Sequence, residues 1–141
     1  MQPRDTPIYI LLVEDDPVDV LDITHKFEKL NKSIEIYTAN NGLEALNKLN
    51  GQKGEIKIPK PHLIILDTKM PKMNGIEFLR KIRISDQFND IPVFMVTGLY
   101  SSQDKIDTRE LNVSAHIVKP LAQDDVVHMY MTVLKLPGFS I

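Results

Sequence analysis

Four short apolar runs divide the chain, at residues 8–13, 63–66, 93–96 and 116–118. Each is rich in β-branched or aromatic residues and too short for a buried helix. Continuous apolar runs of this kind are typical of parallel strands that are covered on both faces. A weaker segment at residues 34–38 alternates apolar and polar positions, which indicates an edge strand with one wetter face. The pattern therefore predicts five strands.

Amphipathic helical segments fill the intervals. Asp16 followed by Pro17 predicts an N-cap with proline in the first helical position. Later helices are predicted from near Asn41, after Asn74, and from Ser101 or Ser102 to about residue 111. Apolar residues recur every three or four positions in four of the helices: Val20, Ile23, Phe27 and Leu30; Ala45, Leu46 and Leu49; Phe78, Leu79 and Ile82; and Val127, Tyr130, Met131 and Leu134.

The order strand–helix, repeated five times, requires parallel crossovers with helices on both faces of the sheet. We therefore expect a doubly wound α/β fold. Residues 51–61, rich in Lys, Gly and Pro, are predicted to form an exposed loop before the third strand. No repeat or linker divides the sequence, so residues 1–141 are predicted to form a single domain with its core at about 8–135 and short tails at both ends.

Composition narrows the possible functions. Seventeen Lys and Arg against nineteen Asp and Glu give a net charge of −2. A protein that binds nucleic acid directly normally has a basic surface, which this balance of charges does not indicate. The absence of cysteine excludes disulfides, thiolate metal sites and a Cys nucleophile. No apolar run approaches the roughly 20 residues that span a bilayer, and residues 1–5 lack the apolar stretch of a secretion signal. We expect a cytoplasmic protein that does not bind membranes.

Chemically active side chains follow four of the predicted strands. Glu14 and Asp15 follow the first, Asp67 the third, Thr97 the fourth and Lys119 the fifth. In open parallel sheets, ligands bind beyond the carboxyl ends of the strands. Carboxylates that converge there repel one another unless a hard cation such as Mg²⁺ is present. Together with the hydroxyl and the ammonium group, they indicate phosphoryl transfer, with Asp67 attacking phosphorus to give an acyl phosphate.

Four motifs carry a resemblance to a known family: residues 11–16 (LLVEDD), 66–75 (LDTKMPKMNG), 96–98 (VTG) and 118–120 (VKP). Over residues 8 to about 135 the chain resembles the receiver domains of two-component response regulators. This resemblance implies a flavodoxin-like fold with strand order 2-1-3-4-5. The long loop before Asp67 and the absence of an output domain are similar to the stand-alone regulators that partner bacterial phytochrome kinases.

The resemblance also implies roles for individual residues. Asp67 matches the phosphoacceptor, which takes phosphate from a histidine kinase. Asp15 matches the direct Mg²⁺ ligand, Glu14 its partner, and the backbone carbonyl of Lys69 the third protein ligand. Thr97 matches the switch hydroxyl that hydrogen-bonds to the phosphoryl group.

Three further positions match the family pattern or depart from it. Lys119 matches the lysine that pairs with the phosphate, and Pro120 the residue whose preceding peptide bond is typically cis. Gly75 matches the turn glycine that opens the third helix. The family's switch aromatic residue is His116 here, and this histidine is either a working switch or an ordinary, partly exposed strand residue.

Several alternatives stay open at this level. Asp16 is either a helix cap or a site residue, and the Lys69 side chain is either exposed or in contact with the phosphoryl group or Glu14. Leu99 flanks the site as Lys69 does. The apolar tail with Phe139 and Ile141 is either frayed or an interface element.

The sequence thus predicts a phospho-accepting signal transducer rather than an enzyme. Its output surface is predicted on the fourth helix, fifth strand and fifth helix, for a downstream protein or a second copy, near Tyr100, His116, Val127 and Met131. The alternative is a Mg²⁺-dependent phosphohydrolase that forms an aspartyl phosphate. Such enzymes carry a second acid two residues after the nucleophile, where this chain has Lys69. Flavin or nucleotide binding lacks support, because no glycine-rich phosphate loop is present.

Overall fold

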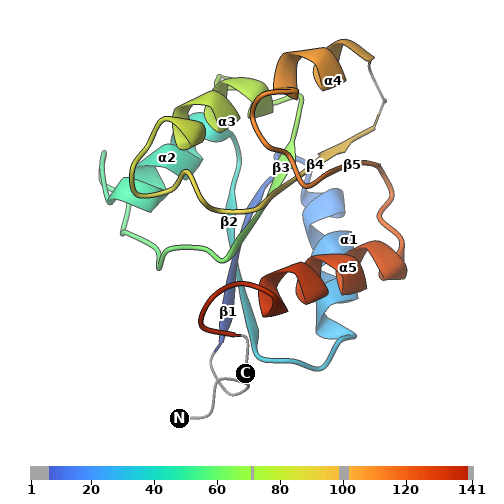
Figure 1. Cartoon of the computed structure of the whole chain (residues 1–141). Coiled ribbons are helices and arrows are strands. Elements are labelled where there is room, and N and C mark those ends of the chain that lie inside the picture. Colours follow the sequence, from blue (N-terminus) through green and yellow to red (C-terminus); the bar gives the residue numbers. More distant parts are fainter. Residues whose placement is uncertain (1–6, 71, 99–101, 140–141) are drawn as a thin grey trace.

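Five strands alternate with five helices in the computed structural model, which describes residues 7–70, 72–98 and 102–139 (Figure 1). In chain order these elements are β1 (Ile8–Val13), α1 (Pro17–Glu28), β2 (Ile34–Ala39), α2 (Gly42–Asn50), β3 (Leu63–Asp67), α3 (Gly75–Arg83), β4 (Val93–Thr97), α4 (Ser102–Thr108), β5 (Ala115–Val118) and α5 (Gln123–Leu134). The predicted alternation of strands and helices is confirmed.

All the strand pairs of the sheet are parallel, and the strand order is β2-β1-β3-β4-β5. The register places Val13 opposite both Ala39 and Leu66, and Thr97 opposite Val118. The carboxyl ends of the strands therefore lie along one edge of the sheet. This is the predicted doubly wound, flavodoxin-like fold.

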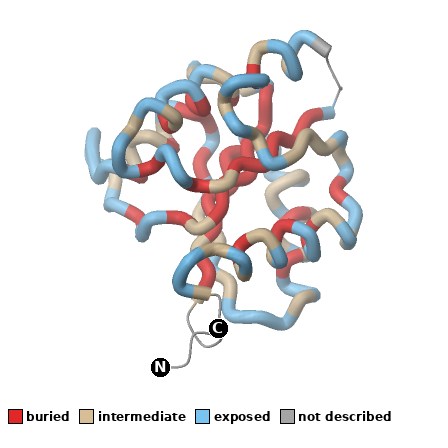
Figure 2. Tube along the Cα trace, viewed as in Figure 1, coloured by how far each residue is buried: buried red, intermediate tan, exposed pale blue. Residues whose placement is uncertain are grey.

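Two apolar clusters pack on opposite faces of the sheet. Alternate strand residues such as Leu11 and Leu66 face α2 and α3, whereas Leu12 and Ile65 face α1 and α5. Side chains in the central strands β1, β3 and β4 are almost fully buried, and Figure 2 shows the buried positions concentrated along them. None of the described helices combines the length and the apolar character needed to cross a lipid bilayer.

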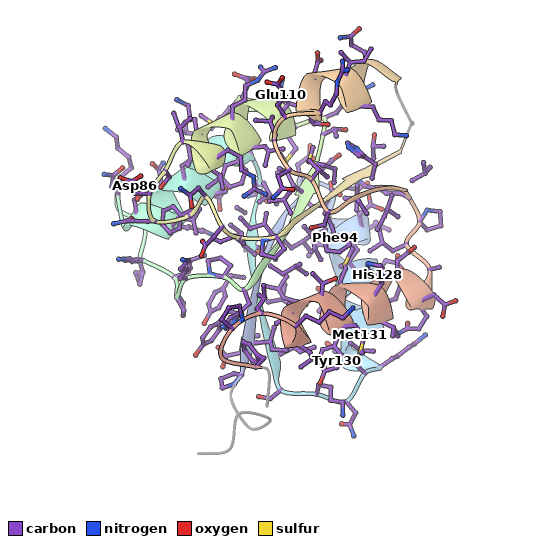
Figure 3. All side chains as sticks on the ribbon, in the orientation of Figure 1. Asp86, Phe94, Glu110, His128, Tyr130 and Met131 are labelled. Carbon is purple, nitrogen blue, oxygen red and sulfur yellow. The ribbon has the colours of Figure 1, made fainter. Side chains whose placement is uncertain are left out.

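The predicted apolar stripe of α5 is wrong in its register. Val126, Met129 and Val133 are the residues that pack into the core, while Val127 and Met131 are 41% and 47% exposed. Adjacent apolar positions along this helix allow two overlapping stripes, and the packing against the sheet selects one of them. An aromatic contact also joins α5 to the sheet: the rings of His128 on α5 and Phe94 on β4 meet edge to face, with centroids 5.8 Å apart. Both residues are labelled in Figure 3.

The fourth helix ends earlier than predicted, at Thr108 rather than near Leu111. The Thr108 hydroxyl donates to the carbonyl of Asp104 at 2.7 Å, and the next backbone bonds span only three residues, from Leu111 N–H to the Thr108 carbonyl at 2.9 Å. Asn112 then adopts a φ of 54°. Tight turns and a left-handed residue therefore replace the last predicted helical turn.

Phe139 is neither frayed nor exposed as an interface element. Its ring meets His62 edge to face with centroids 4.9 Å apart, and it packs against the cluster on the α1 and α5 face. His62 in turn stacks on Tyr9 at 5.6 Å, and its Nδ1 accepts a hydrogen bond from the Tyr9 N–H at 3.0 Å. The segment after α5 is thus tied to the start of β1. Ile141 lies outside the described residues.

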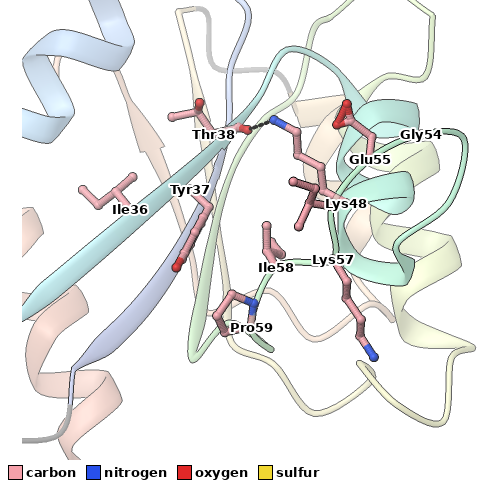
Figure 4. A pocket seen from close by; sticks show the side chains of 10 residues that line it. Ile36, Tyr37, Thr38, Lys48, Gly54, Glu55, Lys57, Ile58 and Pro59 are labelled. Carbon is pink, nitrogen blue, oxygen red and sulfur yellow. Dashed lines mark hydrogen bonds between the residues drawn. The ribbon is translucent and has the colours of Figure 1, made fainter.

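The loop between α2 and β3 is exposed over most of its length, as predicted, although Ile58 is buried. A hollow of about 700 Å³ lies between this loop and β2 (Figure 4). There the Lys48 ammonium group donates to the carbonyl of Thr38 at 2.8 Å. Lys48 thus places a charged group against the backbone of the edge strand β2, and such a charge disfavours pairing with another chain.

Candidate functional site

The strand ends deliver the predicted side chains to one place. Asp67 is the last residue of β3 and Thr97 the last of β4, and both are 5% exposed. Glu14 follows β1 directly and is 1% exposed, whereas its neighbour Asp15 is exposed. Lys119 follows β5 and is tied to β4 by a backbone bond to the Thr97 carbonyl at 2.8 Å. Parallel pairing of the central strands therefore builds the site.

The turn after β3 leaves room for a glycine alone at position 75. The Gly75 N–H donates to the Thr68 carbonyl at 3.2 Å, and a Cβ placed on Gly75 lies only 2.1 Å from the backbone carbonyl oxygen of Asp67. Asn74 caps α3 in a reciprocal capping box with Glu77. The start of α3 thus packs directly on the backbone that carries the Asp67 carboxylate.

Three carboxylates form a candidate metal centre. One oxygen from each of Glu14, Asp15 and Asp67 lies within 4.8 Å of the other two. Hard divalent cations prefer carboxylate oxygens of this kind. Two of the three acids are buried, and burying like charges side by side is unfavourable without a compensating cation. The donor set therefore fits a divalent metal ion.

Lys119 supplies positive charge to the same pocket. Its ammonium nitrogen lies 2.5 Å from Glu14 Oε1, 3.0 Å from Asp19 Oδ2 and 3.5 Å from Asp67 Oδ2. The Lys119–Pro120 peptide bond is cis, as the resemblance implies. The ammonium group is thus held beside the Asp67 carboxylate, where it can pair with an incoming anion.

Burial and ion pairing shift the pKa values of Glu14 and Lys119. Desolvation raises the pKa of Glu14 to about 7, against the opposing effect of Lys119, and the nearby charge of Asp67 adds to the rise. Burial alone would lower the pKa of Lys119, but its pairing with Glu14 and Asp19 outweighs burial and holds that pKa well above the ordinary value of 10.5. Lys119 therefore stays positively charged, while burial makes the Glu14 carboxylate easier to protonate than an exposed one.

Asp16 caps α1, which resolves the alternative left by the sequence. Its Oδ1 accepts from the Val18 N–H at 2.9 Å, and its own N–H donates to Glu14 Oε2 at 3.2 Å. Asp16 is not one of the three clustered carboxylates. Its backbone nevertheless helps to orient Glu14.

The other predicted residues have contacts of their own. The Lys69 side chain is exposed, while its backbone N–H donates to Asp67 Oδ1 at 3.3 Å. His116 is half-buried, and its Nε2 lies 3.2 Å from the Thr108 hydroxyl of α4. Burial, aided by the charge of Lys105, lowers the pKa of His116. Leu99 and Tyr100 lie outside the described residues.

Asp19 is a contact that the sequence reasoning missed. It lies in the first turn of α1, and its Oδ2 accepts a hydrogen bond from Lys119 Nζ across 100 residues of sequence. An acid in the first turn of a helix is explained by the helix dipole alone. No local pattern shows that its side chain reaches the end of another strand.

Comparison with known proteins identifies the class. Residues 10–131 match the family of response regulator receiver domains, and the chain belongs to this family. Receiver domains are signal transducers rather than enzymes, which decides against the phosphohydrolase alternative. The acidic pocket of Glu14, Asp15 and Asp67 is consistent with a phospho-accepting response regulator.

Individual relatives share this architecture. A two-component response regulator from Legionella pneumophila is 40% identical with a TM-score of 0.84, over 92% of this chain and 99% of that one. The bacteriophytochrome response regulator RtBRR is 34% identical with a TM-score of 0.78, over 93% and 80% of the two chains.

One relative has a solved structure with a bound metal ion. The response regulator Rcp1 of Synechocystis is 31% identical over 87% of this chain and 84% of that protein. The Mn²⁺-bound form of Rcp1 superposes with a TM-score of 0.76 at 28% identity, over 96% and 97% of the chains. By contrast, the chain spans half the length of a CpxR homolog from Haemophilus influenzae, to which it is 32% identical over 89% of its own residues.

Proposed function

We propose that this protein accepts a phosphoryl group on Asp67 from the phosphohistidine of a sensor kinase. The observation that carries the proposal is the position of the Asp67 carboxylate, which clusters with the acids Glu14 and Asp15 and lies 3.5 Å from the Lys119 ammonium nitrogen. A carboxylate nucleophile beside a cation site and a fixed ammonium group is suited to phosphoryl transfer.

The transfer exchanges one bond to phosphorus for another. An Asp67 carboxylate oxygen attacks phosphorus in line with the phosphorus–nitrogen bond of the phosphohistidine, and an oxygen–phosphorus bond forms as that bond breaks. The leaving imidazole nitrogen keeps the electron pair of that bond. The ring is then neutral if its other nitrogen already carries a proton, and otherwise it takes one from water. Lys119, 3.5 Å from Asp67 Oδ2, pairs with the phosphoryl oxygens.

Mg²⁺ is the proposed cofactor, held by Glu14, Asp15, Asp67 and the backbone carbonyl of Lys69, and it supplies positive charge that screens the phosphoryl oxygens. The carboxylate geometry and the Mn²⁺-bound relative support a divalent ion at this place. Thr97, buried at the end of β4, is the proposed hydroxyl donor to the phosphoryl group. A movement of Thr97 toward the phosphoryl group would in turn change the position of the half-buried His116 on β5.

The donor is proposed to be a sensor histidine kinase of the phytochrome type. This proposal is supported by the similarity to a bacteriophytochrome response regulator at 34% identity. The proposed output surface is formed by α4, β5 and α5, where Ile106, Val118, Val127 and Met131 are exposed apolar side chains. A downstream protein or a second copy of the chain would bind there.

Acetyl phosphate in Mg²⁺ tests the function without the kinase. The protein should gain one phosphoryl group by intact mass, and Asp67→Asn should gain none. Asp86→Asn is a matched control, because Asp86 is exposed and lies outside the acidic cluster. Unchanged labelling of the Asp67→Asn variant would refute Asp67 as the acceptor.

A further inference from the structure

The Asp19 carboxylate turns away from its own helix. In α2, α3 and α5, the residue in the third helical position is also acidic, and it accepts from the backbone N–H of the N-cap or, in α2, of the residue before the N-cap. These acids are Glu44, Glu77 and Asp125, at 3.2, 3.3 and 2.8 Å. In α1 the N-cap N–H of Asp16 donates to Glu14 instead, and Asp19 accepts from Lys119 at 3.0 Å.

This contact gives Lys119 a third carboxylate partner, contributed by α1. A lysine ammonium group has three N–H donors, and Glu14, Asp19 and Asp67 are the three carboxylates around it. Glu14 and Asp67 belong to the cluster that fits a divalent cation, whereas Asp19 does not. The attraction of Glu14 and Asp67 for Lys119 falls when a cation shares their charge, but the attraction of Asp19 persists.

We propose that Asp19 is a positioning residue for Lys119. It keeps the ammonium group beside Asp67 and leaves an N–H for the phosphoryl group on that residue. The inference rests on the proposed function, because it assigns how the phosphate-pairing lysine is held during that reaction. Asp19 itself is not one of the carboxylates clustered at the candidate metal centre.

The negative charge of Asp19 and its positioning of Lys119 have opposite effects on the binding of an anion beside Asp67. If Asp19 acted through its charge alone, its removal would reduce repulsion and strengthen the binding of an anion beside Asp67. If it positions Lys119, its removal weakens anion binding. Asp22→Asn is the matched control, because Asp22 lies one turn further along α1, loses the same charge and pairs with Lys26 rather than with Lys119.

The experiment measures beryllofluoride binding in Mg²⁺ by fluorine NMR on the full chain, together with Mg²⁺ affinity and the thermal midpoint. We expect Asp19→Asn to weaken beryllofluoride binding about fivefold, as suits a partly exposed ion pair. Asp22→Asn should stay close to wild type, Asp19→Glu should restore part of the affinity, and Mg²⁺ affinity should barely change.

Three results would overturn the inference. The first is an Asp19→Asn variant that binds beryllofluoride as tightly as Asp22→Asn, or more tightly than wild type. The second is an equal loss in Asp19→Asn and Asp19→Glu with a lowered thermal midpoint, which indicates a structural role. The third is a wild-type protein that binds no beryllofluoride, which refutes the proposed function as well. The first two results leave the proposed function intact.

Discussion

Replacing Gly75 with alanine tests whether α3 packs directly on the backbone of the acceptor residue. The added Cβ would lie 2.1 Å from the Asp67 carbonyl oxygen and 3.0 Å from both the Asp67 carbonyl carbon and the Thr68 Cα. All three are backbone atoms, so no side-chain rotation relieves the clash. Either α3 or the end of β3 has to move by about 1 Å to restore a normal contact.

The magnitude follows from two opposing effects. Overpacking at a tightly packed position destabilises by about 1–3 kcal/mol, and the better helix propensity of alanine offsets up to about 1 kcal/mol of it. We expect Gly75→Ala to lose about 2 kcal/mol of unfolding free energy, which lowers the thermal midpoint of a chain this size by about 4–8 °C. Because a 1 Å displacement of a reacting group slows reactions by up to about 100-fold, labelling of Asp67 should slow as well.

Urea unfolding and the rate of acetyl phosphate labelling are the two assays. Gly98→Ala is the control, because a Cβ at position 98 meets no described atom within 4 Å. That variant should stay within about 0.5 kcal/mol of wild type. Equal stability and equal labelling rates for the two variants would refute the close packing of α3 on Asp67.

Three further predictions concern pH, packing and metal. Burial lowers the pKa of His62 below 6.5, so the unfolded chain binds the proton first and the contribution of His62 to stability should fall as pH drops below about 6.5. His62→Asn, which keeps an acceptor for the Tyr9 N–H, should flatten this fall in urea titrations at several pH values; an unchanged slope contradicts it. Arg83 donates to four backbone carbonyls around α3, so Arg83→Ala should lose about 2–3 kcal/mol in urea unfolding, whereas the exposed Arg80→Ala should lose almost none; equal losses would refute this role. Mg²⁺ should raise the thermal midpoint of the wild type but scarcely that of Asp15→Asn, and an equal rise in both would exclude Asp15 as a ligand.

Much of the site follows from the sequence because it is built from strand ends. A parallel sheet brings its carboxyl ends to one edge, so Glu14, Asp67 and Lys119 were predicted to converge from the apolar runs before them. The helix starts at Asp16, Asn41 and Asn74 were equally readable, since their side chains cap the backbone locally.

Features that depend on tertiary packing could not be predicted in this way. Apolar residues at adjacent positions give α5 a broad apolar face, and packing against the sheet decides that Val126 is buried and Val127 exposed. At the early end of α4, the Thr108 hydroxyl lies 3.2 Å from His116 Nε2 on β5, a contact that no local pattern shows. The contact of Asp19 with Lys119 joins a helix to a distant strand end, and only the folded chain brings the two together.

The most direct test of the central claim locates the phosphoryl group itself. After acetyl phosphate labelling in Mg²⁺, borohydride reduction converts an aspartyl phosphate to homoserine, which marks the acceptor for peptide mass spectrometry. The account predicts homoserine at position 67 and its loss when Mg²⁺ is removed with EDTA. Homoserine at another aspartate, or none in a labelled protein, would contradict it.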